Sequence, residues 1–240
     1  PCPGRTMIEE PTTFRTHDVI AKDLVRALEK EIIFCELAPG ARLTQEDIVG
    51  RFNVSHSPVR EALRSLKQDG LIVMASRRGA RVSPLMVEDL DEIYKCRIPL
   101  EALAAEIAAT DRTDEACKAM NASLQALRMA LQLKNPRTFF EANVVLTNAI
   151  NASTHNRTLI RLLANIGKQA FRYRYIAYQR SPDLMERSVD YNTEIVEAII
   201  SQKPRHARSL TEDVLESSWK TVRERIGALG DDDILVSQKL

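Results

Sequence analysis

The 240-residue sequence has few of the residues on which metal centres, disulfide scaffolds and enzymes depend. It contains four histidines and four cysteines, and no two cysteines form a Cys-x-x-Cys pair. A zinc ribbon and a secreted disulfide framework are therefore not expected. A glycine-rich phosphate loop, a nucleophile elbow and a His-Glu-x-x-His motif are also missing, which argues against an enzyme.

Long apolar runs are missing as well. The apolar stretches are short and interrupted by charges, whereas a membrane span needs about 20 consecutive apolar residues. The first residues lack the basic-then-apolar order of a signal peptide. Apolar residues make up 44% and charged residues 28% of the chain, as in ordinary globular proteins. We therefore expect a soluble, cytoplasmic protein that makes no membrane contact.

The length and the distribution of charge add two expectations. A chain of 240 residues has room for two domains, since a domain usually has roughly 100–200 residues. The net charge is only +1, but residues 51–81 carry seven Lys or Arg against two Asp or Glu, a local charge of +5. An anionic partner would meet this segment first.

The N-terminal part predicts two helices before residue 54. In the stretch 18–34, apolar residues recur every four positions, which is the spacing of one helix face. A break at 38–40 follows. Thr44 and Asp47 then form a capping box that starts a second helix, and this helix ends near Asn53.

A third helix and a hairpin complete this unit. The helix begins at Ser57-Pro58, a hydroxyl N-cap followed by proline at the first helical position, and it ends near Gly70. Two short strands at 71–74 and 80–82 follow it. Three helices and a β-hairpin wing are typical of a winged helix-turn-helix.

Everything after residue 84 predicts helix, and no strand pattern interrupts it. The breaks fall at Thr113, Pro136, Asn156, Pro182 and Pro204. The expected helices are 87–109, 114–133, 137–153, 158–179, 183–202 and 204–228, with core stripes that include Leu90, Ile93, Ile98, Leu103, Ile107, Leu159, Leu162, Leu163 and Ile166. The fold class is therefore mainly α, with a winged helix-turn-helix followed by an antiparallel bundle of six to seven helices.

The third helix and the wing carry candidate DNA contacts. A helix-turn-helix inserts its third helix into the major groove, N-terminal end first. Arg60 could pair with guanine or hold a phosphate, and both possibilities stay open here. The wing could reach an adjacent minor groove. The residues left for solvent or DNA are Ser55, His56, Ser57, Arg60, Arg64 and Lys67 on the helix, and Arg77 and Arg78 at the tip of the wing.

These segments resemble the winged-helix motif of the GntR family of bacterial repressors. The resemblance rests on Leu37-Ala-Pro-Gly-Ala-Arg-Leu43, Val54-Ser-His-Ser-Pro-Val-Arg-Glu-Ala-Leu63 and Arg77-Arg-Gly-Ala-Arg-Val82. It implies a homodimer that binds a short palindromic operator, usually to repress, and it adds Gly79 to the DNA contacts. Two positions depart from the family pattern, which usually has arginine at His56 and often at Glu46. A phosphate contact from His56 would be weaker and pH-sensitive.

The second half resembles the FCD effector domain of the FadR-like subfamily. Arg97-x-x-x-Glu101, Ala104-Ala105 and Ala108-Ala109 are similar to the opening helix of that domain. The resemblance implies that a carboxylate-bearing metabolite binds there and releases the operator. We therefore expect a flexible leader at 1–15, a DNA-binding domain at 16–83, an effector-binding and dimerisation domain at 84–229 and a flexible tail at 230–240.

Many FCD domains hold a divalent metal with an Asp-x-x-x-His pair and two later histidines. Aligned on that pattern, the four positions fall on Asn143, Thr147, Asn192 and about Val214, none of which is a strong metal ligand. The histidines of the chain stand elsewhere, at His17, His56, His155 and His206. We therefore expect no metal and no other cofactor. The alternative is a regulator whose effector site depends on a metal.

A site without a metal must hold an organic acid with its own donors. Arginine is suited to this because it binds a carboxylate bidentately. The predicted effector-binding residues are Arg97, Asn143, Thr147, Arg172, Arg174, Tyr178 and Asn192. An adaptor that binds only protein is the remaining alternative, but it would not need an arginine-tipped wing.

Overall fold

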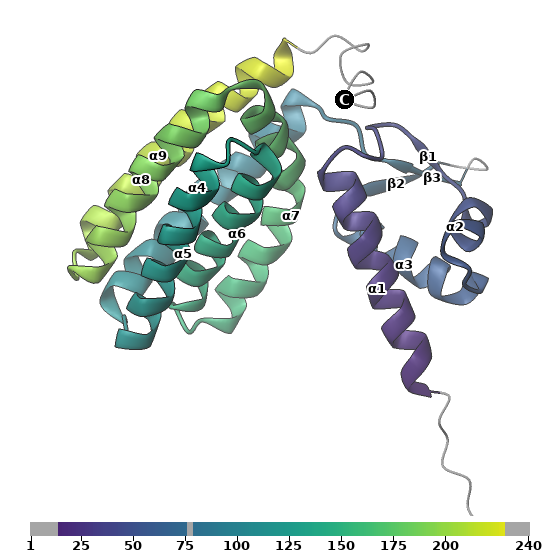
Figure 1. The fold of residues 1–240 in the computed structure, drawn as a ribbon, viewed down its shortest axis with the longest axis horizontal. Coiled ribbons are helices and arrows are strands. Elements are labelled where there is room, and N and C mark those ends of the chain that lie inside the picture. Colours follow the sequence, from purple (N-terminus) through teal and green to yellow (C-terminus); the bar gives the residue numbers. More distant parts are fainter. Residues whose placement is uncertain (1–13, 76–78, 229–240) are drawn as a thin grey trace, which may run out of the picture.

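The computed structural model describes residues 14–75 and 79–228. Figure 1 shows a small N-terminal domain of helices and a sheet beside a bundle of long helices, with α7 at the side of the bundle nearest to α1. Within the described ranges, no helix is both long enough and apolar enough to cross a membrane.

The N-terminal domain has the predicted winged helix-turn-helix architecture. Its three β-strands pair antiparallel in the order β1-β3-β2. Its core is built from all three helices and the strands, with Leu28, Leu66 and Val82 fully buried. The helices are α1 (Phe14–Ile33), α2 (Gln45–Phe52) and α3 (His56–Gln68), and the strands are β1 (Arg42–Leu43), β2 (Ile72–Ala75) and β3 (Gly79–Val82).

Local chemistry explains where α2 begins and ends, as predicted. The Thr44 side chain accepts a hydrogen bond from the backbone N–H of Asp47 at 3.1 Å, which satisfies one of the free donors of the first turn. At the other end, Asn53 adopts a left-handed conformation with φ of 49°. Asparagine tolerates this conformation better than most residues, and the helix stops there.

Two predicted helix starts in this domain need correction, and one strand was missed. Helix α1 begins at Phe14 rather than at residue 18. Helix α3 begins at His56 with Ser55 as its N-cap, so Pro58 stands at the third helical position. Proline fits there because the N–H groups of the first turn have no partner within the helix. Strand β1 was not predicted, since two residues are too few to show a period.

The C-terminal domain contains six helices in the described chain, which is the lower of the two predicted numbers. Side-chain caps start several of them: Thr113 accepts from Ala116 N at 3.1 Å, and Asn156 accepts from Leu159 N at 3.1 Å. The helices are α4 (Val87–Thr110), α5 (Asp114–Gln132), α6 (Pro136–Ala152), α7 (Arg157–Arg180), α8 (Pro182–Ile200) and α9 (Pro204–Gly227).

The apolar core of the bundle is largely as predicted, with two exceptions. Leu90 and Leu163 are buried, but Leu103 is 37% and Leu162 is 48% exposed. In sequence, the two exposed leucines directly precede Ala104 and Leu163, which form a small cluster with Leu159 that is separate from the main core. The helical period identified the correct side of α4 and α7, but it could not distinguish the centre of an apolar stripe from its edge.

Candidate functional site

The exposed face of α3 carries the predicted DNA contacts. Ser55, His56, Arg60 and Arg64 are exposed, and Ser57 is half-buried. The buried apolar positions recur at the i, i+3, i+4 and i+7 spacing of one helix face, so the polar and basic side chains share the opposite face. The positions of this stripe are Val59, Ala62, Leu63 and Leu66, and Pro58 is also buried.

Part of the local positive charge is used within the domain. Arg51 Nη2 donates to Glu31 Oε1 at 2.6 Å, and Arg81 Nη1 donates to the Gly40 carbonyl at 2.9 Å. Gly79 opens β3, is exposed and has φ of 79°, a backbone conformation that favours glycine. The predicted contacts Arg77 and Arg78 lie outside the described residues. The basic surface described here therefore centres on α3.

A cavity of about 110 Å³ lies in the C-terminal domain. Helices α4, α6, α7, α8 and α9 each contribute side chains to its wall. Thr147, one turn after Asn143 on α6, donates its hydroxyl hydrogen to the Asn143 carbonyl at 3.0 Å. Six of the seven predicted effector-binding residues line the cavity, namely Arg97, Asn143, Thr147, Arg174, Tyr178 and Asn192.

Ser188 on α8 joins these residues, although no sequence pattern distinguished it from other serines. Its Oγ accepts from Asn143 Nδ2 at 3.1 Å and from Asn192 Nδ2 at 3.2 Å. The Tyr178 hydroxyl lies 3.4 Å from the same Oγ. Arg174 Nη2 in turn donates to Asn143 Oδ1. A hydroxyl is both donor and acceptor, and Ser188 thus links α6, α7 and α8 at the cavity wall.

Arg97 on α4 is the most deeply buried cation of the cavity. It is 2% exposed, and its Nη2 and Nε each lie 2.7 Å from Glu101 Oε1. Burial disfavours the charged form, but the Glu101 carboxylate and Tyr94 outweigh it, so the pKa of Arg97 is raised above its usual value. Its Nη1 is buried and has no hydrogen-bond partner among the described residues. Arg97 lines the cavity, and a buried guanidinium nitrogen without a partner is an unused hydrogen-bond donor.

A stack of side chains lies behind Arg97. The guanidinium carbon of Arg97 lies 4.7 Å from the centre of the Tyr94 ring. Trp219 on α9 stacks on the Tyr94 ring, with the ring centres 6.4 Å apart and the planes at 15°. Trp219 Nε1 donates to Asp91 Oδ1 at 2.8 Å, which fixes the indole. The position of Arg97 is thereby tied to α9 as well as to α4.

The charges around the cavity favour an anion. Arg97, Arg174 and Arg187 line it, and Glu101 is the one carboxylate among the lining residues. Arg187 donates to Ser217 Oγ at 2.8 Å. Because the wall also carries amides and hydroxyls, it can both neutralise a carboxylate and hydrogen-bond other oxygens of the same molecule.

The residues at the positions of the FCD metal ligands do not fit a divalent metal. Asn143, Thr147, Asn192 and Val214 all line the cavity, but they offer no anionic charge and no imidazole nitrogen. Within residues 14–75 and 79–228, no group of three or more His, Cys, Asp or Glu could hold a metal ion. The cavity therefore offers a donor set for organic anions rather than for a transition metal.

Arg172 does not belong to the cavity. It is buried, and its Nη1 donates to the Ser83 carbonyl at 2.6 Å, in the segment between β3 and α4. Burial lowers the pKa of its guanidinium, although Tyr173 and Cys35 partly oppose the shift. The structure thus places Arg172 at the junction between the two domains and not in the wall of the cavity.

Comparison with known proteins supports both halves of this description. Residues 20–82 match the family described as bacterial regulatory proteins, gntR family. Residues 92–217, more than half of the chain, match the FCD domain. The two matches coincide with the winged helix-turn-helix and with the bundle that holds the cavity.

The similar proteins named here are transcription regulators rather than enzymes. The HTH-type transcriptional regulator YdhC of Bacillus subtilis is 34% identical over 58% of this chain and 62% of its own length. The HTH-type transcriptional repressor RspR of Escherichia coli is 32% identical over 51% of this chain and 54% of its own length. The matched region therefore spans only about half to three fifths of these relatives.

The fold is that of solved regulators. The structure of E. coli McbR/YncC aligns with a TM-score of 0.76 over 86% of this chain and 98% of the other, at 19% identity, so this likeness concerns the fold alone. With both domains matched and in this order along the chain, the protein belongs to the GntR family of bacterial regulatory proteins and carries an FCD domain.

Proposed function

We propose that the protein is a sequence-specific transcription regulator that represses by binding a palindromic operator as a homodimer. A small carboxylate-bearing metabolite, held in the C-terminal cavity without a metal, releases it from the DNA. The name of RspR as a transcriptional repressor supports the direction of regulation.

The N-terminal domain supports the DNA-binding half of this proposal. Ser55, His56, Ser57, Arg60 and Arg64 lie together at the start and along the open side of α3. In a helix-turn-helix, the N-terminal end of the recognition helix is the end that contacts the bases in the major groove. Side chains of this kind hold phosphates and read base edges.

The unpaired Nη1 of Arg97 is the main observation in support of metabolite binding in the cavity. Arg97 lines the cavity, and a guanidinium that gives one edge to Glu101 and has an unpaired nitrogen is suited to a second carboxylate. Arg174, Asn143 and Asn192 would hold the remaining oxygens. Arg172, which points to the domain junction, is no longer part of the proposed effector set.

The test begins with selection of a binding duplex from a random pool of double-stranded DNA. Metal-stripped protein is then screened by thermal shift against organic acids and sugars, because a ligand that binds only the native state raises the melting temperature. We expect at least one carboxylate to raise the melting temperature and to release the selected duplex. A failure to enrich any duplex, or release of the duplex only by uncharged sugars, would contradict the proposal.

A pair of variants locates the effector. Asn192→Leu removes an amide from the cavity wall and should weaken the response to the carboxylate without changing affinity for the duplex. Asn148→Leu, on the exposed side of α6, is the matched control and should respond like the wild type. An unchanged response of Asn192→Leu would place the ligand away from Ser188 and α8.

A further inference from the structure

Helix α7 borders both domains. Arg174, Ala177 and Tyr178 line the cavity, while residues on its other sides contact the N-terminal domain and the segment that follows it. Lys168 Nζ lies 3.0 Å from Asp69 Oδ2 at the end of α3 and 3.4 Å from Glu29 Oε2 on α1. The helix is thus in direct contact with the DNA-binding unit as well as with the cavity.

The segment between the domains is also fixed to α7. Arg172 donates to the Ser83 carbonyl at 2.6 Å. The Tyr173 hydroxyl donates to the Met86 carbonyl at 3.1 Å and accepts from the Met86 N–H at 3.2 Å. These hydrogen bonds hold the segment between β3 and α4 against α7.

A cluster of four aromatic side chains, here called the Phe34 cluster, lies where α1 ends. Phe34, directly after α1, packs edge-on against Tyr175 on α7 and Phe140 on α6, with ring centres 4.9 Å and 5.9 Å apart. Phe140 also packs against Phe171, at 5.4 Å. The cluster therefore packs the residue that follows α1 against α6 and α7 of the C-terminal domain.

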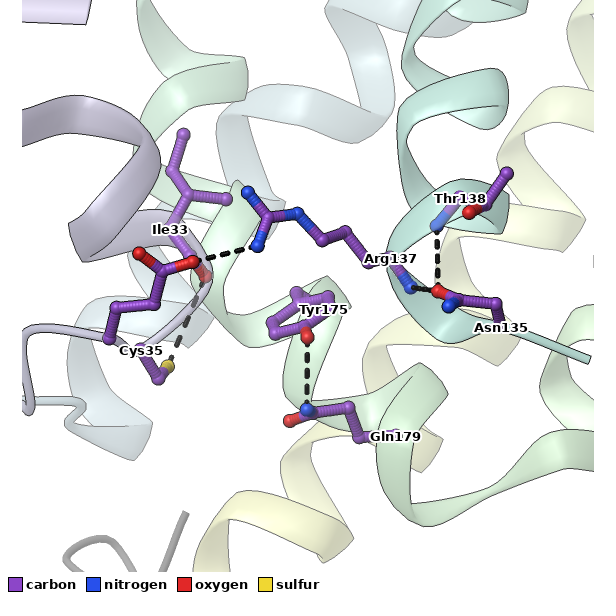
Figure 2. A network of polar contacts seen from close by, with 8 residues as sticks. Ile33, Cys35, Asn135, Arg137, Thr138, Tyr175 and Gln179 are labelled. Carbon is purple, nitrogen blue, oxygen red and sulfur yellow. Dashed lines mark hydrogen bonds and ion pairs between the residues drawn. The ribbon is translucent and has the colours of Figure 1, made fainter. Parts of the chain in front are cut away.

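The same junction carries an ion pair. Arg137 on α6 lies over the Phe34 ring, 4.0 Å from its centre, and its Nη1 lies 2.7 Å from Glu36 Oε1. Figure 2 shows Arg137 reaching from α6 toward the chain near Ile33 and Cys35, with Tyr175 beside it. Aromatic contacts and an ion pair therefore hold the residues that follow α1 against α6 and α7.

Arg174 contacts the cavity and the Phe34 cluster at once. Its Nη2 donates to Asn143 Oδ1 in the cavity wall. Its guanidinium carbon lies 5.8 Å from the centre of the Phe140 ring and 6.0 Å from that of Phe171. A carboxylate in the cavity would therefore compete with two aromatic rings for the same guanidinium.

We propose that Arg174 and the Phe34 cluster couple the cavity to the end of α1, so that a displacement of the Arg174 guanidinium loosens the hold of the effector domain on the DNA-binding domain. Arg174 is a positioning residue in this scheme, since it acts on α1 through Phe140 and Phe34. The proposal rests on the proposed function for its biological meaning, but the contact can be tested without DNA or effector.

The experiment is amide hydrogen exchange on the full chain. The reporters are the amides of Phe34, Cys35 and Leu37, which are bonded to the carbonyls of Lys30, Ile32 and Glu31. The amides of α2, in the same domain but outside the junction, serve as the internal reference. Arg174→Met should raise exchange of the reporters relative to α2 by about threefold or more, because local opening becomes easier.

Three further variants separate coupling from general damage. Arg97→Met also removes a buried arginine from the cavity wall, but Arg97 stacks on Tyr94 and not on the Phe34 cluster, so the reporters should stay near the wild-type rate. Arg174→Lys keeps the charge and should exchange less than Arg174→Met. In protein that already carries Phe140→Leu, Arg174→Met should raise the exchange of the reporters hardly at all, because substitutions that act through the same contacts are not additive.

Two results would overturn the coupling. One is equal reporter exchange in Arg174→Met and Arg97→Met, which would show a general effect of losing a buried arginine. The other is full additivity of Arg174→Met and Phe140→Leu. If Arg174→Met does not melt cooperatively, Arg174→Lys replaces it in the test. The exchange of the reporters is then compared between Arg174→Lys and the double variant with Phe140→Leu, and full additivity would again overturn the coupling. None of these readouts depends on whether the proposed operator or effector exists.

Discussion

Arg60 tests the DNA-facing side of α3 most directly at the scale of single residues. It is exposed one turn into the helix, beside the buried stripe that contains Val59 and Leu63. We expect Arg60→Ala to weaken binding of the selected duplex by about 1–3 kcal/mol, the usual worth of an arginine contact to a base. Electrophoretic mobility shift at fixed salt measures the change.

Arg205→Ala on α9 is the control for this substitution, because it removes an exposed arginine from the other domain. Its affinity for the duplex should equal that of the wild type, and both variants should keep their melting temperature. Equal affinities of Arg60→Ala and the wild type would refute the assignment of this face to DNA.

Two arginines on α7 show where the prediction of individual effector-binding residues from the sequence failed. Arg172 and Arg174 were both assigned to the effector, but only Arg174 lines the cavity. At 3.6 residues per turn, side chains two positions apart point about 160° away from each other. They could not both face one cavity, although the sequence alone did not say which would. Ser188 was missed because a lone serine in a helix carries no pattern that distinguishes a bridging hydroxyl from a solvated one.

At the scale of elements, the helix boundaries were the most predictable feature. Thr113 and Asn156 cap their helices through side-chain bonds, and Pro136, Pro182 and Pro204 open theirs. These signals are local, so the sequence shows them directly. The cavity depends on which side chains of five helices meet, and this long-range information was accessible only through the family resemblance.

Gly70, which follows α3, sets the turn into the wing. It has φ of 73°, and a Cβ there would meet the Gln169 side chain at 3.4 Å. Gly70→Ala should therefore lower the free energy of unfolding by about 1 kcal/mol or more, since alanine is strained at positive φ. Urea denaturation of the two proteins measures the difference.

Gly50 provides the opposite case within the same domain. It lies inside α2, and a Cβ there would meet nothing within 4 Å. Gly50→Ala should raise the free energy of unfolding by about 0.4–1 kcal/mol, because alanine favours a helix and restricts the unfolded chain. If both substitutions shifted stability in the same direction, the backbone argument for the turn after α3 would be wrong.

At the scale of the whole molecule, the cavity predicts a protein that keeps its structure without metal. Asn143, Thr147, Asn192 and Val214 cannot repay the dehydration of a divalent ion. Purified protein should contain no stoichiometric transition metal, and chelator treatment should leave its melting temperature and its duplex affinity unchanged. One zinc or nickel per chain by elemental analysis, lost together with stability on chelation, would disprove this.

The assembly state is a second expectation for the whole molecule. A single winged helix reads too few base pairs for a regulator, and a palindromic site requires two-fold symmetry. We expect a mass of two chains by light scattering at micromolar concentration, with and without the selected duplex. A single-chain mass under both conditions would leave the proposed mode of DNA binding without support.

The stack behind Arg97 gives the molecule an optical reporter. The sequence contains one tryptophan, and Trp219 lies on the Tyr94 ring that also faces the Arg97 guanidinium. A carboxylate that draws Arg97 away from Tyr94 changes the charge next to the indole, so the emission of Trp219 should shift as the cavity fills. Tyr94→Leu should suppress the shift while leaving the change in melting temperature. Effector titration can then be followed in unlabelled protein by the fluorescence of a single residue.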